Sequence, residues 1–425
     1  MSKLEFTQEE WEKIENNGTY CPGLFNSKYI ETDGKLRACC VQDLKGEHYT
    51  NTESYNTTSL KQARQNSLSG IKDSSCARCW ENELLNTRSY RQGLVESAIH
   101  WKSKIKDNIN VDYSITEPTI DYLDIRFDNI CNLRCRYCST IFSSSWRHET
   151  ELLEKELPIF KYIKRRSVDT KILNSVTDID TILADLKTVK KIFFAGGEPL
   201  VNDKHYEVLE YLIDNNRTDI EITYNTNFTN IKKVIPYWKK FSNIHVGASL
   251  DANYKRGEYI RKNLLWDQIV ENRKLMIAEV PHVQFEINAS MSILNAYNVV
   301  DFHKEWINDK LIGPFDFTAW NFVSKPEHYD IRNLPDHHKI KLKEIYQTHI
   351  DWLNSLTSSN DIKFKSKNDS SFAIQSYQGI INRLNLSRNS SFDKFWEFDK
   401  WLDNNRDENF FDVFPEYEDF ARYFS

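Results

Sequence analysis

The eight cysteines of this chain lie in its first third, and their grouping limits what the chain can fold into. Five lie within the first hundred residues, at Cys21, Cys39, Cys40, Cys76 and Cys79. Three more share one short segment, at Cys131, Cys135 and Cys138, and residues 139–425 contain none. Cysteines bunched in this way are typical of metal ligands. The sequence therefore predicts two metal sites in front of a scaffold that contains no cysteine.

From about residue 120, apolar strand-like segments alternate with helical ones. The expected strands are Tyr122–Phe127, Lys191–Ala195, Glu221–Tyr224, Ile244–Ser249, Val283–Ser290 and Phe315–Phe322. The expected helices are Ser144–Glu156, Tyr206–Asn215, Lys232–Phe241, Trp266–Glu279 and Val300–Asp309. This alternation predicts βα units around a parallel sheet. We expect an α/β fold, a partial (βα)6 barrel of the TIM type, and periodicity alone leaves a doubly wound sheet as the alternative.

The chain changes character after Trp320. Asp336–Ser355 predicts a long amphipathic helix with Asp336 as its N-cap. The polar stretch Asn354–Ser371 predicts a connection, and the tail is rich in aromatic and acidic residues. Another polar stretch, Lys161–Ser175, predicts a surface insertion in the first βα unit. We divide the chain into a cysteine-rich module at 1–105, a barrel at 118–325 and a helical, aromatic-rich C-terminal extension at 326–425.

The bulk properties exclude several classes of protein. The N-terminus is acidic and polar and lacks the apolar core of a signal peptide. No stretch reaches the roughly 18–20 apolar residues of a membrane span. The net charge of −6 gives no reason to expect nucleic acid or an anionic membrane as a partner. We expect a cytoplasmic protein, and in that reducing compartment cysteines are metal ligands rather than disulfides.

The segment Asp128-Asn-Ile-Cys-Asn-Leu-Arg-Cys-Arg-Tyr-Cys138 has the spacing C-x3-C-x2-C. Three thiolates on one loop can bind three irons of a 4Fe–4S cluster and leave the fourth iron open, as a catalytic centre requires. The loop follows a predicted strand end, where α/β folds place their chemistry. Zinc is the alternative, but a structural zinc ion takes four ligands. The nearest histidine, His148, is ten residues beyond Cys138.

A second motif, Phe193-Phe-Ala-Gly-Gly-Glu-Pro199, ends the next predicted strand. Two glycines allow close approach of the backbone to a ligand, and the adjacent Glu198 can accept hydrogen bonds from a charged amine. A Gly-Gly pair alone is more often an ordinary turn. Its position one βα unit after the cysteine loop is what favours a functional role.

The two motifs together resemble the radical SAM superfamily, whose cysteine loop carries an aromatic residue at the place of Tyr137. The resemblance covers about residues 118–325. It implies that a 4Fe–4S cluster on Cys131, Cys135 and Cys138 binds S-adenosylmethionine (SAM). It further implies a set of SAM contacts: Tyr137 near the adenine, the Gly196, Gly197, Glu198 and Pro199 turn at the methionine amine, Asn227 and Ser249 at strand ends, and Arg261 as a carboxylate partner. A strand-end cap or a surface position is the alternative for each of the last three.

The N-terminal cysteines form a different pattern. Asp33-Gly34 between apolar flanks predicts a hairpin that brings Cys21 and Cys39 together, and Cys76-x2-Cys79 adds two thiolates. Four thiolates from separate loops can hold a 4Fe–4S cluster completely, and a four-cysteine zinc site is the alternative. This arrangement resembles the SPASM/twitch auxiliary-cluster modules of radical SAM enzymes, although those modules usually follow the barrel. Aligned with their hairpin, Cys39 is the ligand and Cys40 the spare thiol, with the reverse as the alternative.

The resemblance implies an enzyme that reductively cleaves SAM to a 5′-deoxyadenosyl radical and abstracts hydrogen from a substrate. It implies two 4Fe–4S clusters, one catalytic and one auxiliary, and an electron donor of the flavodoxin or ferredoxin type. Oxidative modification of a peptide or protein is our first expectation for the reaction. The alternatives are a sugar-like or nucleotide-like metabolite as substrate, and a non-catalytic metal-binding scaffold. The intact Gly196–Pro199 turn favours an enzyme over a scaffold.

Overall fold

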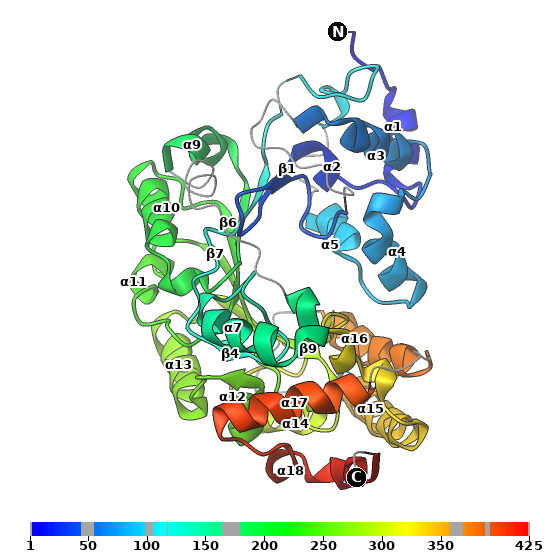
Figure 1. Cartoon of the computed structure of the whole chain (residues 1–425). Coiled ribbons are helices and arrows are strands. Elements are labelled where there is room, and N and C mark those ends of the chain that lie inside the picture. The colour runs from blue at the N-terminus through cyan, green and yellow to red at the C-terminus, as the bar shows by residue number, and fades with distance from the viewer. Residues whose placement is uncertain are drawn as a thin grey trace.

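A computed structural model describes residues 2–43, 55–97, 105–116, 118–163, 179–357, 369–386 and 392–423 (Figure 1). Its centre is an eight-stranded sheet with the order β10-β9-β7-β6-β5-β3-β1-β2. Six of these strands run parallel and lie side by side in chain order. A doubly wound sheet would reverse direction at a switch point, so this order is that of a partial barrel. The predicted α/β fold with a mostly parallel sheet is confirmed.

The six parallel strands all overlap their predicted positions. They are β3 (Tyr122–Ile125), β5 (Lys191–Phe194), β6 (Glu221–Thr226), β7 (Asn243–Ala248), β9 (Gln284–Met291) and β10 (Phe317–Phe322). β6 and β9 alternate strictly between buried and half-buried residues, as period-2 strands with one fully covered face should. Tyr224 on the covered face of β6 packs on Trp238 and hydrogen-bonds His205 of the flanking helices.

Helices cover the outer side of the sheet (Figure 1). They are α7 (Arg147–Glu156), α9 (Ile179–Thr188), α10 (Asp203–Asp214), α11 (Ile235–Trp238), α12 (Tyr254–Ile260), α13 (Trp266–Glu279) and α14 (Val299–Asn308). The predicted helix Lys232–Phe241 is wrong in length, since only α11 forms. Pro236 lies in the first turn of α11, and proline is tolerated in a helix only there. Helices α9 and α12 were not predicted.

Short segments connect these elements near the sheet edge. They are β4 (Arg134–Cys135), β8 (Arg261–Lys262) and the 3-10 turns η4 (Ser144–Trp146), η5 (Pro158–Ile163), η6 (Pro199–Val201) and η7 (Ile293–Asn295). β4 pairs antiparallel with β8 and so joins two distant parts of the barrel. The predicted insertion Lys161–Ser175 lies mostly outside the described residues.

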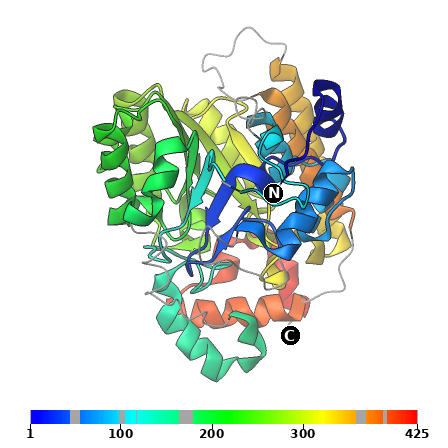
Figure 2. The ribbon, with the colours of Figure 1, turned by 90° about the horizontal axis from the view of Figure 1, so that it is seen from above.

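The N-terminal part joins the barrel through its hairpin (Figure 2). Its elements are α1 (Gln8–Glu15), α2 (Gly23–Asn26), β1 (Ser27–Ile30), β2 (Leu36–Arg37), α3 (Thr58–Leu68), η2 (Ser74–Cys76), α4 (Ala77–Leu84) and α5 (Tyr90–Ser97). β2 pairs with β1, and Gly34 takes the left-handed φ of +80° that the predicted Asp33-Gly34 turn requires. β1 pairs parallel with β3, so the hairpin extends the barrel sheet.

The C-terminal part is helical. Its elements are η8 (Glu327–Tyr329), η9 (Ile331–Asn333), α15 (Asp336–Thr357), α16 (Ser370–Leu384), α17 (Phe392–Arg406), α18 (Phe410–Val413) and η10 (Pro415–Tyr423). The prediction of Asp336 as an N-cap is wrong, because Asp336 is already the first residue of α15. Figure 1 shows α17 and α18 at the opposite end of the molecule from α1 and α3.

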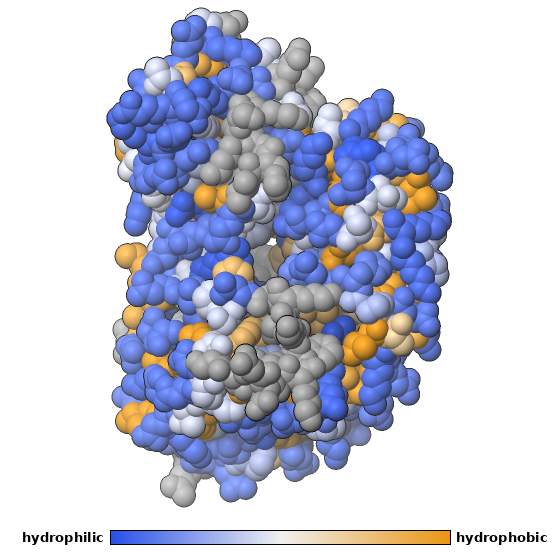
Figure 3. All heavy atoms as spheres, turned by 180° about the vertical axis from the view of Figure 1, so that it is seen from behind, coloured by the Kyte–Doolittle hydropathy of each residue, from blue (hydrophilic) through white to orange (hydrophobic). Residues whose placement is uncertain are grey.

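The outer surface is mostly polar. On the face shown in Figure 3, hydrophilic residues predominate and apolar residues are scattered in small groups. Within the described part of the chain, no helix has both the length and the apolar character needed to cross a membrane.

Candidate active site

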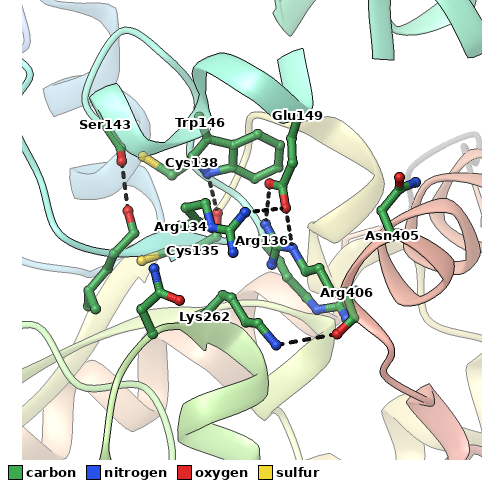
Figure 4. Close-up of polar contacts among 12 residues, drawn as sticks. Arg134, Cys135, Arg136, Cys138, Ser143, Trp146, Glu149, Lys262, Asn405 and Arg406 are labelled. Carbon is green, nitrogen blue, oxygen red and sulfur yellow. Dashed lines mark hydrogen bonds and ion pairs between the residues drawn. The ribbon is translucent and has the colours of Figure 1, made fainter. Parts of the chain in front are cut away.

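The cysteine loop leaves the end of β3 and is fixed to the elements that follow it. Ser143 Oγ donates to the carbonyl of Leu133 at 2.6 Å, and Trp146 Nε1 donates to the carbonyl of Cys135 at 3.0 Å (Figure 4). Ser145 Oγ donates to the carbonyl of Cys131 at 2.6 Å. These three bonds come from η4 and the residue before it, and they satisfy three carbonyl groups of the loop.

Burial disfavours the thiolate form of all three cysteines in the loop. Burial raises the pKa of Cys131 to about 12 and also raises the pKa values of Cys135 and Cys138. Two donors point at the sulfur atoms: Arg261 Nη1 lies 3.7 Å from Cys135 Sγ, and Asn227 Nδ2 lies 3.9 Å from Cys131 Sγ. A buried thiolate needs compensating positive charge, which bound metal supplies.

A single zinc ion and an iron–sulfur cluster require different spacings of the sulfur atoms. Four thiolates on one zinc ion would lie about 3.8 Å apart, given Zn–S bonds of about 2.3 Å in a tetrahedron. Among the described residues, only one group has three ligand atoms within 4.8 Å of one another, and it contains no cysteine. The three sulfurs of the loop therefore do not all lie within 4.8 Å of one another. Three thiolates on one loop match the donor set of a 4Fe–4S cluster with one open iron.

The two glycines after β5 press directly against the cysteine loop. A Cβ on Gly197 would lie 2.2 Å from the carbonyl oxygen of Ile130, and one on Gly196 would lie 2.9 Å from Arg126 Cβ. Gly196 also has a φ of +115°, which side chains disfavour. The amide of Glu198 donates to the carbonyl of Ile130 at 2.8 Å. We predicted close approach to a ligand, and the structure shows that the glycines also allow close approach to the cysteine loop.

Glu198 is buried and ties this turn to the end of β6. Its carboxylate accepts hydrogen bonds from Thr226 Oγ1 at 2.6 Å, from the amide of Asn227 at 2.6 Å and from the amide of Leu200 at 3.1 Å. Burial, only partly offset by these donors, raises the pKa of Glu198 to about 7. Pro199 follows it and opens η6. Hydrogen bonds thus connect the Gly196–Pro199 turn to both the end of β6 and the cysteine loop.

Tyr137 and Arg261 meet on a carboxylate that sequence reasoning did not single out as a site residue. Tyr137 Oη and Arg261 Nε both donate to Asp251 Oδ2, the latter at 2.7 Å. The other oxygen of Asp251 accepts from the amide of Ser290 at 2.8 Å. Asp251 lies just after the end of β7, two residues beyond the predicted Ser249. A buried acid just after a barrel strand was the available signal.

Ser249 and Asn227 lie along the same sheet edge. The amide of Ser249 donates to the carbonyl of Thr226 at 2.7 Å, and Asn227 Nδ2 donates to Asn132 Oδ1 of the cysteine loop at 2.8 Å. All predicted residues of this site therefore lie at the carboxyl ends of β3, β5, β6 and β7 or on the β4–β8 pair. Asn227 and Arg261 reach the cysteine sulfurs, whereas Ser249 reaches only its neighbouring strand.

The C-terminal extension is joined to the cysteine loop by ion pairs. Arg136, between Cys135 and Cys138, is fully buried and forms ion pairs with Asp399, Asp403 and Glu408 at 2.5–2.7 Å. Arg134, on the same loop, pairs with Glu149, which also binds Arg406 (Figure 4). Sequence reasoning missed this network. Two arginines alternating with the loop cysteines, and acids concentrated in 399–408, were its only signals.

Comparison with known proteins assigns the segment that carries this geometry. Residues 125–288 match the family model described as Radical SAM superfamily. This segment is a radical SAM domain. The match names the superfamily of this segment and leaves its reaction open.

Relatives of the radical SAM domain include two cyclases. The GTP 3',8-cyclase of Campylobacter curvus (strain 525.92) is 26% identical over 152 residues, and that of Aliarcobacter butzleri (strain RM4018) is 27% identical over 153 residues. Each match covers 36% of this chain and 41% of the cyclase, so the chain spans about two fifths of the curated relatives it matches. A solved structure described as native anSMEcpe with bound AdoMet aligns at a TM-score of 0.37, with 18% identity, over 57% of this chain and 63% of that one. A likeness at that level adds nothing to the assignment.

The N-terminal cysteines gather beside the radical SAM domain. Cys21, Cys39, Cys76 and Cys79 line a single, mostly apolar cavity, which Leu24 and Arg91 also line. Cys40 does not line it. Burial raises the pKa values of Cys21 and Cys79, and that of Cys76 to about 12, so thiolates here also need compensating charge.

Cys40 does not belong to the lining of this cavity but lies against two residues that do, Cys39 and Tyr90. Its thiol is linked by hydrogen bonds to Cys39 and Tyr90, and Arg126 lies nearby. Together these groups, with Cys39 the largest contributor, lower the pKa of Cys40 to about 6. The four thiols of the predicted set therefore line one cavity, and the predicted spare thiol lies beside Cys39 outside that lining.

Proposed function

We propose that this protein is a radical SAM enzyme that binds a 4Fe–4S cluster on Cys131, Cys135 and Cys138. The observation that carries the proposal is the junction of the two motifs, where Gly197 packs on Ile130 with no room for a side chain. This contact sets the SAM-binding turn directly against the cluster loop. Neither motif alone would support the activity as strongly as their contact does.

The bound cluster and SAM supply a 5′-deoxyadenosyl radical through one-electron reductive cleavage, and the radical removes hydrogen from the substrate. The protein's own residues bind and orient. Glu198, at the end of the turn, faces the methionine amine, and Arg261 offers its guanidinium to the carboxylate. Tyr137 is held by Asp251, and its ring would lie beside the adenine of bound SAM.

We further propose a small, nucleotide-like substrate. Sequence analysis ranked a peptide first and a sugar-like or nucleotide-like metabolite second, and the relatives named GTP 3',8-cyclase support the second. The inner face of the sheet adds support. Asn288 Nδ2 donates to Asn225 Oδ1 at 3.4 Å, and Asn321 Nδ2 donates to Asn288 Oδ1 at 2.7 Å. Such a row of amides offers the paired donors and acceptors that recognise bases and ribose hydroxyls.

The same inner face carries a second polar pair on neighbouring strands. His245 Nε2 lies 3.5 Å from Glu286 Oε1, and both side chains are partly exposed. Polar, half-exposed residues on strands that are otherwise buried favour a small hydrophilic ligand over an apolar one. They support the same substrate class as the amides do.

We propose that Cys21, Cys39, Cys76 and Cys79 hold an auxiliary 4Fe–4S cluster of the SPASM/twitch type. Their shared cavity supports this, and Arg91 on its wall favours a negatively charged thiolate cluster. The proposal includes an electron donor of the flavodoxin or ferredoxin type and a reducing, cytoplasmic location. The predicted domain limits 1–105, 118–325 and 326–425 belong to it as well.

Deuterium transfer tests the substrate class. The anaerobically reconstituted enzyme is incubated with SAM, dithionite and ribose-deuterated nucleoside triphosphates, with deuterated peptide mixtures in parallel. We expect deuterium in 5′-deoxyadenosine with a nucleotide, and a higher KM for that nucleotide in Asn321→Ala. Transfer from peptides alone would overturn the substrate proposal and leave the radical chemistry standing.

A further inference from the structure

Away from the cysteines, two histidines and a carboxylate meet where the C-terminal segment crosses the start of α15. His337 and His338 lie in the first turn of α15, and Asp419 lies in η10. His337 Nε2 is 2.7 Å from Asp419 Oδ2, and His338 Nε2 is 3.1 Å from Asp419 Oδ1. One ligand atom from each residue lies within 4.8 Å of the others, the only such group among the described residues.

The group is built like a coordination site with one open side. The His338 side chain is 5% exposed and packs on Tyr417 and Phe420, while the His337 side chain is 57% exposed. The second ring nitrogen of His338, Nδ1, lies 2.7 Å from the hydroxyl of Tyr297. Metal-binding histidines nearly always have such a partner on the nitrogen that does not bind the metal, because it fixes the ring and the tautomer. His338 therefore presents Nε2 in a fixed direction.

We propose that His337, His338 and Asp419 bind one divalent transition-metal ion of the zinc type. Zn–N and Zn–O bonds of about 2.0–2.2 Å place neighbouring ligands about 3.3–3.4 Å apart in a tetrahedron. The observed separations of 2.7 and 3.1 Å would widen by about 0.2–0.7 Å on binding the ion. Two imidazoles and one carboxylate leave a fourth position for water on the exposed His337 side. The ligand types favour zinc over magnesium or calcium, which prefer oxygen ligands.

The ion would join η10 to α15 within the C-terminal extension, and Tyr297 of the barrel would hold one of its ligands. Asp419 comes from η10, the histidines from α15, and Tyr297 from the connection between β9 and α14. The same C-terminal part supplies Asp399 and Asp403 to Arg136 of the cysteine loop. A metal here would therefore hold in place the segment that braces the cluster loop. The proposal does not depend on the proposed reaction.

Metal titration of the cluster-loaded protein tests the proposal. Zinc is titrated into anaerobically reconstituted wild type, Asp419→Asn, His337→Gln and Glu418→Gln, with bound metal counted by competition against a chromophoric chelator. Glu418 is the exposed neighbour of Asp419, and its variant removes the same charge. We expect wild type and Glu418→Gln to bind one more zinc than Asp419→Asn and His337→Gln. We also expect zinc to raise the Tm of the first two proteins only.

Cobalt separates this site from empty cysteine sites. Cobalt on imidazole and carboxylate ligands gives weak visible bands, whereas cobalt on thiolates gives intense sulfur-to-metal bands. If cluster reconstitution failed, all four proteins would show thiolate bands. Those bands would come from the empty cysteine sites and would not count for or against the proposed histidine site. Equal zinc binding by wild type, Asp419→Asn and His337→Gln would overturn it. His337 is exposed, so its variant can be read even if Asp419→Asn misfolds.

Discussion

Arg136, between the second and third cysteines of the cluster loop, donates a hydrogen bond to Asp399, which lies 263 residues later in α17. Both side chains are completely buried, and their nitrogen–oxygen distance is 2.5 Å. Arg136 also lies over the ring of Tyr259, and its backbone amide donates to the carbonyl of Ile260. The C-terminal extension thus reaches the middle of the cysteine loop at Arg136.

Arg136→Met should be strongly destabilising. The change leaves Asp399, Asp403 and Glu408 without their shared cation, and breaking a buried pair typically costs about 3–5 kcal/mol. Urea unfolding of the reconstituted protein measures this loss, and iron content should fall with it. Lys13→Met, which breaks an exposed pair with Glu9, is the control and should cost under about 0.5 kcal/mol. An equal loss of unfolding free energy in the two variants would contradict this role of Arg136.

Gly197→Ala should disrupt the cluster loop rather than the fold. Its new methyl group would meet the carbonyl of Ile130 at 2.2 Å, so the loop must move. We expect loss of most loop-bound iron with a far-UV circular dichroism spectrum close to wild type. Gly93→Ala is the matched control, because its nearest neighbour would be 3.6 Å away and the residue lies inside α5. If Gly197→Ala keeps its iron, the contact is not what sets the two motifs together.

His205 should make the protein less stable in mild acid. Burial lowers its pKa to about 3, below the value of about 6.5 in the unfolded chain. The unfolded chain therefore binds the proton more tightly, so the free energy of unfolding falls as pH drops below about 6.5 and is unaffected above it. Between pH 7 and pH 5 this residue accounts for a loss of about 2 kcal/mol.

His205→Gln tests this assignment, because glutamine keeps a hydrogen-bonding group near Tyr224 but cannot be protonated. Urea unfolding at pH 7 and pH 5 should show a loss smaller by about 2 kcal/mol in the variant than in wild type. The same pH dependence in both proteins would mean that His205 does not titrate as described.

Cys39→Ala and Cys40→Ala should differ sharply. Cys39 lines the N-terminal cavity with Cys21, Cys76 and Cys79, whereas Cys40 does not. We expect Cys40→Ala to keep the auxiliary iron and sulfide, and Cys39→Ala to lose them while keeping those of the catalytic loop. Iron and sulfide analysis, with zinc measured in parallel, checks both the ligand choice and the metal. The reversed pattern would make Cys40 the ligand.

The sequence predicted what depends on local pattern. The six strands follow from apolar segments, and the hairpin follows from Asp33-Gly34, because each signal lies within a few residues. Contacts between distant residues were out of reach. No local rule pairs Arg136 with Asp399, and none predicts that β1 joins β3 at the edge of the barrel sheet. The helix at Lys232–Phe241 failed because the apolar spacing outweighed Pro236 in the prediction.

In the candidate site, too, local motifs could be predicted and contacts between distant residues could not. Both motifs were recognisable because their residues are adjacent in the chain. Asp251 was missed because its role depends on Tyr137 and Arg261 arriving from two other segments. His337 and His338 drew no attention because their partner, Asp419, lies 82 and 81 residues away.

The central claim is that Cys131, Cys135 and Cys138 hold a cluster that cleaves SAM. The most direct measurement is 5′-deoxyadenosine formed by the anaerobically reconstituted protein with SAM and dithionite, beside Cys135→Ala. The account predicts 5′-deoxyadenosine from the wild type and none above background from the variant. An iron-loaded wild type that forms none, or a Cys135→Ala variant that forms as much, would contradict it.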